Sequence, residues 1–184
     1  MRPRLFLSAL AVCAAAWSQE IVLRPDPAHT TVQFKLGATL HTVHGTFQLA
    51  RGAVRYNPAT GHISGEIVVD AASGKSGDPK RDRNMHRDVL QSVRYPEIVF
   101  TPDRVTGTIA SQGDSRVQVH GTFRIHGTAH EITLPVDVHM SGGQVSVKTN
   151  FTIPYVEWGM KNPSTLLLRV SDKVEIEAAA VALP

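Results

Sequence analysis

Histidine is the residue type in this chain that most invites a chemical interpretation, with nine copies among 184 residues. His120, His130 and His139 are expected on the outer face of two strands, and a cross-strand pair of His120 and His139 could bind zinc. Such a site needs three or four ligands that converge at about 2.0–2.1 Å from the ion. We therefore favour the simpler interpretation of solvated surface side chains. His86, in an expected helix near a cavity mouth, is the histidine to test first.

Other catalytic motifs are missing from the sequence. No serine lies in a nucleophile-elbow pattern, and no two carboxylates stand at a spacing that fixes them together. The glycine-containing segment 73–77 lacks the spacing of a phosphate-binding loop. The single cysteine, Cys13, excludes a disulfide framework and a multi-thiolate metal site. These features predict a protein that is not an enzyme and has no cofactor.

Residues 1–18 have the pattern of an export signal. Two arginines precede an apolar run of about twelve residues over 5–16, and small residues stand at 16 and 18, where a signal peptidase reads the chain. The run is too short to cross ~30 Å of hydrocarbon as a helix. We expect cleavage before Gln19, a single domain over 19–184, and a periplasmic or secreted protein without stable membrane insertion. Acylation of Cys13 is the minor alternative.

The charge of the expected mature chain is nearly balanced. Without residues 1–18 it keeps seventeen lysines and arginines against sixteen acidic residues, so the formal charge falls from +3 to +1. The densest basic run, 80–83, is interrupted by an acid, whereas a surface that follows phosphates needs several cations along one face. We expect no nucleic-acid partner.

Alternation of apolar and polar residues dominates the elements that must position any site. A period of two is typical of strands with one buried face. The clearest runs are 117–125, 132–140 and 145–153, joined by tight turns at 126–128 and 141–143. Shorter runs are 32–36, 47–49, 54–56, 63–71, 98–100, 166–170 and 174–178.

One helix is expected, over 80–91. Asp78 is a suitable N-cap and Pro79 suits the first helical position, while Met85, Val89 and Leu90 would form the buried stripe. About eight or nine strands joined by hairpins must close or pack as two sheets, because an open sheet leaves its edges and apolar face exposed. The size of the chain favours closure into a barrel. We predict an all-β protein, an extended eight-stranded antiparallel lipocalin-like barrel with one short helical insertion.

The inward-facing residues decide whether the barrel is filled or hollow. The large ones are Phe34, Phe47, Phe100, Phe123, Phe151, Val69, Ile132, Leu134 and Met140. The small ones are Gly65, Ala71, Gly121, Thr149 and Ala178. The large side chains alone would form an ordinary core, whereas the small ones remove volume and favour an apolar tube. The pattern leaves both interpretations open.

Several motifs, in their order and spacing, resemble the YceI-like family of exported lipocalin-like proteins. They are the segments 26–30, 44–47, 81–90, 95–100 and 121–127, and the resemblance covers about residues 24–178. It implies a barrel whose apolar tunnel holds a polyisoprenoid or similar amphipathic lipid, and it implies no catalysis. The segments 73–76 and 155–159 depart from the family pattern, so the identity of the lipid does not carry over.

The leading hypothesis is therefore a carrier or store for a long apolar lipid. The inward residues of the tube would contact the chain, and Met85, His86, Tyr155 and Trp158 would lie at a mouth shaped by residues 73–92 and 154–164. A ligand-free, solid-cored β module for protein interaction or envelope stress tolerance is the alternative. The sequence leaves the oligomeric state open, a homodimer included.

Overall fold

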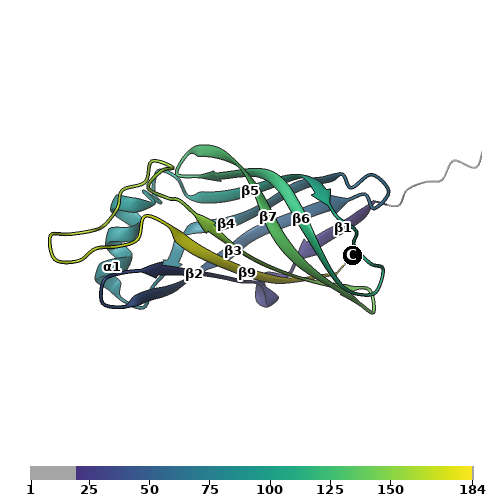
Figure 1. Cartoon of the computed structure of the whole chain (residues 1–184), viewed down its shortest axis with the longest axis horizontal. Coiled ribbons are helices and arrows are strands. Elements are labelled where there is room, and N and C mark those ends of the chain that lie inside the picture. The colour runs from purple at the N-terminus through teal and green to yellow at the C-terminus, as the bar shows by residue number, and fades with distance from the viewer. Residues whose placement is uncertain (1–19, 184) are drawn as a thin grey trace, which may run out of the picture.

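Residues 20–183 are described by the computed structural model, and they form one long barrel with a helix across one end (Figure 1). The strands are β1 (Ile21–Pro25), β2 (Thr31–Gly37), β3 (Thr42–Tyr56), β4 (Ile63–Lys75), β5 (Glu97–Thr106), β6 (Gly113–Ile125), β7 (Thr128–Ser141), β8 (Gln144–Ile153) and β9 (Val174–Leu183). The remaining elements are the 3-10 turn η1 (Pro27–His29), the helix α1 (Pro79–Asn84) and its π-helical continuation η2 (Met85–Val89). The expected export signal lies outside the described residues.

The barrel closes because β2 pairs with both β3 and β9, while β3 to β9 pair in chain order. All the pairings are antiparallel, which confirms the predicted eight-stranded barrel. The ninth strand, β1, shares a position with β2, since it also lies between β3 and β9. The first position of the barrel is therefore split in two, and η1 separates the halves. The alternation pattern missed β1, which has only five residues and ends in proline.

Shifts in strand register correct the predicted strand boundaries. Leu49 pairs with Val69 and Arg51 with Val68, so Ala50 is an extra residue in β3. The extra residue reverses the phase of the alternation, which is why a single strand resembled two short ones. Further shifts lie in β3 between Thr46 and Gln48, and in β5 between Pro102 and Arg104.

The two turns predicted around residues 126–128 and 141–143 are confirmed as two-residue hairpin loops. Positive φ values of 51° at His126 and 79° at Gly127 connect β6 to β7. Gly142 and Gly143, at 57° and 81°, do the same between β7 and β8. Two successive residues with positive φ give the turn whose twist matches that of the flanking strands.

The expected strand over 166–170 is wrong. Leu166 and Leu167 occupy a turn, and Val170 alone forms an isolated bridge, with Ala38. This segment lies beyond the end of the barrel, so its apolar run has no neighbouring strand along its length.

The helix begins where the sequence predicts. The Asp78 carboxylate accepts hydrogen bonds from the amides of Lys80 at 2.8 Å and Arg81 at 2.9 Å, which pairs two of the unsatisfied donors of the first turn. Leu90 is buried and Met85 and Val89 are half-buried, so the predicted stripe does face the barrel. No helix of residues 20–183 is long and apolar enough to cross a membrane.

Candidate ligand-binding site

A cavity of about 950 Å³ runs through the barrel. It is lined by inward residues of all the strands and by loop residues at both ends, with Ile109 at one end and Leu168 and Val170 at the other. This volume is near the upper end of the range for small-molecule sites, and it equals the volume of about thirty water molecules. The interior is therefore hollow, and the solid core expected under the alternative is wrong.

Most residues predicted to bind a ligand do line this cavity. They are Phe34, Phe47, Val69, Met85, Phe100, Phe123, Leu134, Met140, Phe151 and Tyr155. Their rings cluster: the centroids of Phe34 and Phe47 lie 5.5 Å apart, and those of Phe123 and Phe151 lie 6.0 Å apart. Of the small inward residues, Thr149 and Ala178 also line the cavity. The wall is thus aromatic and aliphatic along most of its length.

Gly121 is not among the lining residues, and its role differs from the predicted one. A Cβ atom at this position would overlap the carbonyl oxygen of Thr101 and would lie 2.7 Å from Cα of Pro102. The glycine therefore permits β5 and β6 to approach closely beside the β5 bulge. It does not serve to enlarge the lumen.

Trp158 and Ile132, which were also predicted to bind a ligand, lie away from the cavity wall. Their neighbour His130 was predicted on the outer face of the sheet, and that prediction is wrong. His130 pairs with Phe123 across β6 and β7, so it lies on the inner side of the sheet and not on its outer face. Residues 130 and 132 are two apart in β7 and therefore face the same side of the sheet. Because Ile132 was predicted to face inward, His130 should have been predicted inward as well. The Trp158 indole stacks on the His130 imidazole with the ring centroids 4.0 Å apart, and Ile132 packs against the buried cluster at the helix end of the barrel.

His86 is a positioning residue and does not line the cavity. Its Nε2 lies 2.9 Å from the carbonyl oxygen of Gly74, and its Nδ1 lies 3.2 Å from the buried Ser92 hydroxyl. Because a carbonyl can only accept, Nε2 must carry the hydrogen and Nδ1 accepts from Ser92. Both nitrogens are thereby used to fix η2 against β4.

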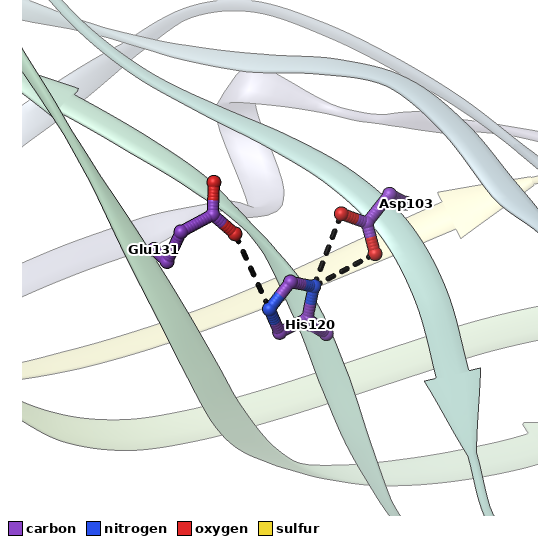
Figure 2. Close-up of side chains that lie close together, drawn as sticks. All are labelled: Asp103, His120 and Glu131. Carbon is purple, nitrogen blue, oxygen red and sulfur yellow. Dashed lines mark hydrogen bonds and ion pairs between the residues drawn. The ribbon is translucent and has the colours of Figure 1, made fainter.

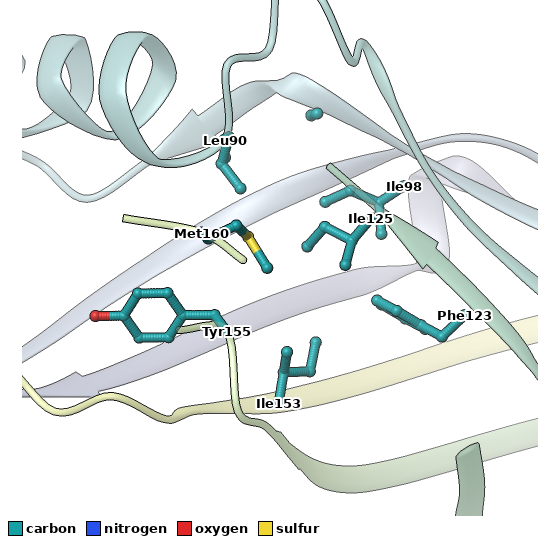
Figure 3. Packing of buried hydrophobic residues seen from close by; sticks show 8 residues of the cluster. Leu90, Ile98, Phe123, Ile125, Ile153, Tyr155 and Met160 are labelled. Carbon is teal, nitrogen blue, oxygen red and sulfur yellow. The ribbon is translucent and has the colours of Figure 1, made fainter. Parts of the chain in front are cut away.

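Tyr155 and Met160 close the helix end of the cavity from the segment that follows β8. Figure 3 shows them beside Leu90 from the helical insertion and Ile98, Ile125 and Ile153 from the strands, with the Tyr155 hydroxyl directed away from the cluster. That hydroxyl donates to the carbonyl oxygen of Ser171 at 2.7 Å. Burial and the nearby Asp172 carboxylate raise the pKa of Tyr155 to about 12, so the hydroxyl stays a donor. Met160 has no periodic neighbours in its loop and was missed from the sequence.

The mouth beside α1 is the polar part of the cavity. The lining there includes Ser76, Asp78, Lys80, Arg81 and Asn84, as the predicted position of the mouth requires. The Arg81 guanidinium donates to the Ser76 hydroxyl at 2.7 Å and to its carbonyl oxygen at 2.8 Å. The side chain is thus held at the rim.

The structure does not bring His120 and His139 together, in agreement with the interpretation favoured from the sequence, which was against a zinc site. His120 pairs with Thr133 and His139 with Asp114, which places the two histidines six residues apart along β7, or about 20 Å at ~3.4 Å per residue. His139 instead contacts the Asp114 carboxylate at 2.6 Å.

On the outer face, His120 lies between two acidic residues (Figure 2). Its Nδ1 is 2.8 Å from the Asp103 carboxylate and its Nε2 is 3.3 Å from that of Glu131. The donor atoms of the three side chains lie within 4.8 Å of one another, which is the kind of set that could hold a metal ion. Each carboxylate contacts a different ring nitrogen, so the imidazole bridges the two acidic residues. We assign the cluster to linking β5, β6 and β7.

Comparison with known proteins gives consistent relatives. The family model described as a YceI-like domain matches residues 24–182. UPF0312 proteins of two Vibrio vulnificus strains, YJ016 and CMCP6, are each 26% identical over 133 residues, which cover 70% of this chain and 67% of theirs.

Solved structures show the same fold. BcnA of Burkholderia cenocepacia has a TM-score of 0.73 at 21% identity, covering 86% of this chain and 99% of its own. A polyisoprenoid binding domain from Saccharophagus degradans has a TM-score of 0.69 at 15% identity, covering 88% and 97%. The YCEI protein of Campylobacter jejuni has a TM-score of 0.64 at 17% identity, covering 79% and 87%.

Proposed function

The chain belongs to the family of YceI-like domains, and on that premise we propose that it binds a long-chain apolar lipid, a polyisoprenoid or similar amphipathic lipid, inside the barrel. The proposed role is transport or storage after export, without catalysis. The name of the Saccharophagus degradans domain supports a polyisoprenoid as the class of ligand. The observation that carries the proposal is the cavity of about 950 Å³ with its apolar wall.

An apolar cavity of this volume favours a long hydrocarbon chain over water. Water gains little in an apolar space, because it needs two to four polar partners there. Each methylene that moves from water into the wall contributes about 0.8 kcal/mol, so affinity grows with chain length and needs few polar contacts. The polar residues gather at the mouth beside α1, where Lys80 and Arg81 would meet a headgroup.

The test is to identify what the purified mature protein contains. Native mass spectrometry and solvent extraction should find an apolar chain bound to the barrel, and an emptied sample should take up an isoprenoid or fatty acyl probe from cyclodextrin. A protein that is isolated empty and takes up neither probe contradicts the proposal.

A further inference from the structure

Three leucines at the mouth end of the barrel are almost fully exposed. The exposed fractions are 85% for Leu40, 99% for Leu166 and 92% for Leu167. Single exposed apolar residues are ordinary on protein surfaces, whereas several in one place mark an interaction site. We call these three residues the leucine tip.

The leucine tip is built by two turns. Ala38 donates to the carbonyl of His41 at 3.0 Å across a two-residue loop that contains Leu40. Thr165 donates to the carbonyl of Leu168 at 2.8 Å across a second loop, made of Leu166 and Leu167. Turn centres usually carry glycine, proline, asparagine, aspartate or serine. The two loops have four positions, 39, 40, 166 and 167, and leucine occupies three of them. The turns themselves therefore do not explain these leucines.

Hydrogen bonds hold the two turns together. The Thr39 amide donates to the carbonyl of Arg169 at 2.9 Å, and the Arg169 amide donates to the Thr39 hydroxyl at 3.0 Å. In Figure 1 both turns project from the end of the barrel that carries α1. Leu168, next to the tip, lines the cavity, so the apolar surface continues from the tip into the lumen.

Charge around the mouth differs from charge on the rest of the molecule. The segments 37–42, 76–96 and 154–173 carry eight lysines and arginines against five acidic residues. Elsewhere in residues 20–184 there are nine cations against eleven acids. The excess of positive charge is thus confined to the end with the exposed leucines.

We propose that this end docks on an anionic phospholipid bilayer, with the leucine tip inserted at the boundary between headgroups and acyl chains. Apolar side chains beside cations form the combination that binds a membrane interface, since burial and attraction to anionic lipids add. The tip would place the mouth of the cavity against the bilayer. The inference goes beyond the proposed lipid binding and gives the barrel a source for its ligand.

Flotation with vesicles tests the docking directly. The mature protein should bind vesicles of phosphatidylglycerol and phosphatidylethanolamine, and high salt should weaken that binding because it screens the cations. Vesicles of phosphatidylcholine should bind it more weakly. The double variant L166S/L167S should lose binding about tenfold or more. The double variant A59S/T60S, in the turn at the opposite end, should bind as the parent does.

A second measurement reports the depth and does not depend on loss of binding. In the variant Leu166→Trp, the introduced indole should shift its emission to the blue on vesicles and be quenched by brominated acyl chains, whereas in Ala59→Trp it should do neither. Equal binding by L166S/L167S and the parent, or binding indifferent to vesicle charge, overturns the proposal. So does a parent dimer that this double variant converts to a monomer, because a second copy would then cover the tip.

The two proposals fail separately. Uptake of an isoprenoid probe from cyclodextrin needs no membrane, so L166S/L167S should still take up the probe if the cavity binds lipid. A parent that binds vesicles but takes up no probe supports the docking and contradicts the lipid-binding function.

Discussion

Ala178 is the residue at which the hollow lumen can be tested by filling it. It lines the cavity midway along β9, between Val32 and Thr149 in the sheet. We expect Ala178→Phe to fold and to block uptake of a long-chain probe, because the ring can occupy empty volume. Ala53→Phe, on the exposed face of β3, is the matched control and should take up the probe normally. Normal uptake by the Ala178 variant would show that the chain binds elsewhere.

Gly121 should be intolerant of even the smallest side chain. Because its Cβ would meet the backbone of β5, we expect Gly121→Ala to lower the free energy of unfolding by about 1–3 kcal/mol. Gly37 is the matched control, since its Cβ would meet only Cβ of Ser171 at 3.8 Å. Chemical denaturation of Gly121→Ala and Gly37→Ala measures the difference in the free energy of unfolding. Equal stabilities would contradict the close approach of β5 and β6 at Gly121.

His126 should make the stability of the protein depend on pH. Burial, assisted by the Arg94 guanidinium, lowers the pKa of this histidine. The unfolded chain therefore binds its proton first as the pH falls below about 6.5, and the free energy of unfolding declines from there down to the folded pKa. Asparagine also adopts positive φ before glycine, so His126→Asn should fold and show a smaller decline between pH 7 and pH 5. The exposed His44→Asn should keep the parent decline; identical slopes in parent and His126→Asn would contradict the assignment.

Among the elements, the segment 154–173 is held over the cavity in part by the hydrogen bond from the Tyr155 hydroxyl to the carbonyl of Ser171. Tyr155→Phe removes the bond to the carbonyl of Ser171, and we expect a loss of about 0.5–1.5 kcal/mol in stability. Amide exchange should accelerate within 154–173 and remain unchanged in the barrel strands, and a bound probe should dissociate faster. Exchange that accelerates throughout the chain would show a global effect instead of local opening.

The strands were largely predictable because the barrel has one buried face, so inward residues recur with period two. The bulge at Ala50 hid the continuity of β3, since local periodicity cannot distinguish a change of phase from a break. His130 was predictable from its parity with Ile132. Met160 and the Tyr155 hydrogen bond were not, because irregular segments bury residues by tertiary contact and without any repeat. The cavity itself depends on how side chains fill the space between opposite walls, which no single strand determines.

At the scale of the whole molecule, occupancy of the lumen should govern stability. A ligand that binds only the folded state stabilises it by RT ln(1 + [L]/Kd), which is about 2.7 kcal/mol at a hundredfold excess over Kd. Solvent extraction should therefore lower the melting temperature, and reloading with an isoprenoid should restore it, as calorimetry can measure. A melting temperature unaffected by both treatments would contradict lipid binding in the lumen.

The split first position of the barrel gives its wall a seam. Three residue pairs join β1 to β3 and two join it to β9, whereas thirteen join β6 to β7. On heating or under mechanical force, the pairings of β1 with β3 and β9 should break before those of the long hairpins. A barrel that opens only along β1 can widen while its other strands stay paired. A lipid chain too bulky for the end of the barrel would then have a lateral entrance beside β1.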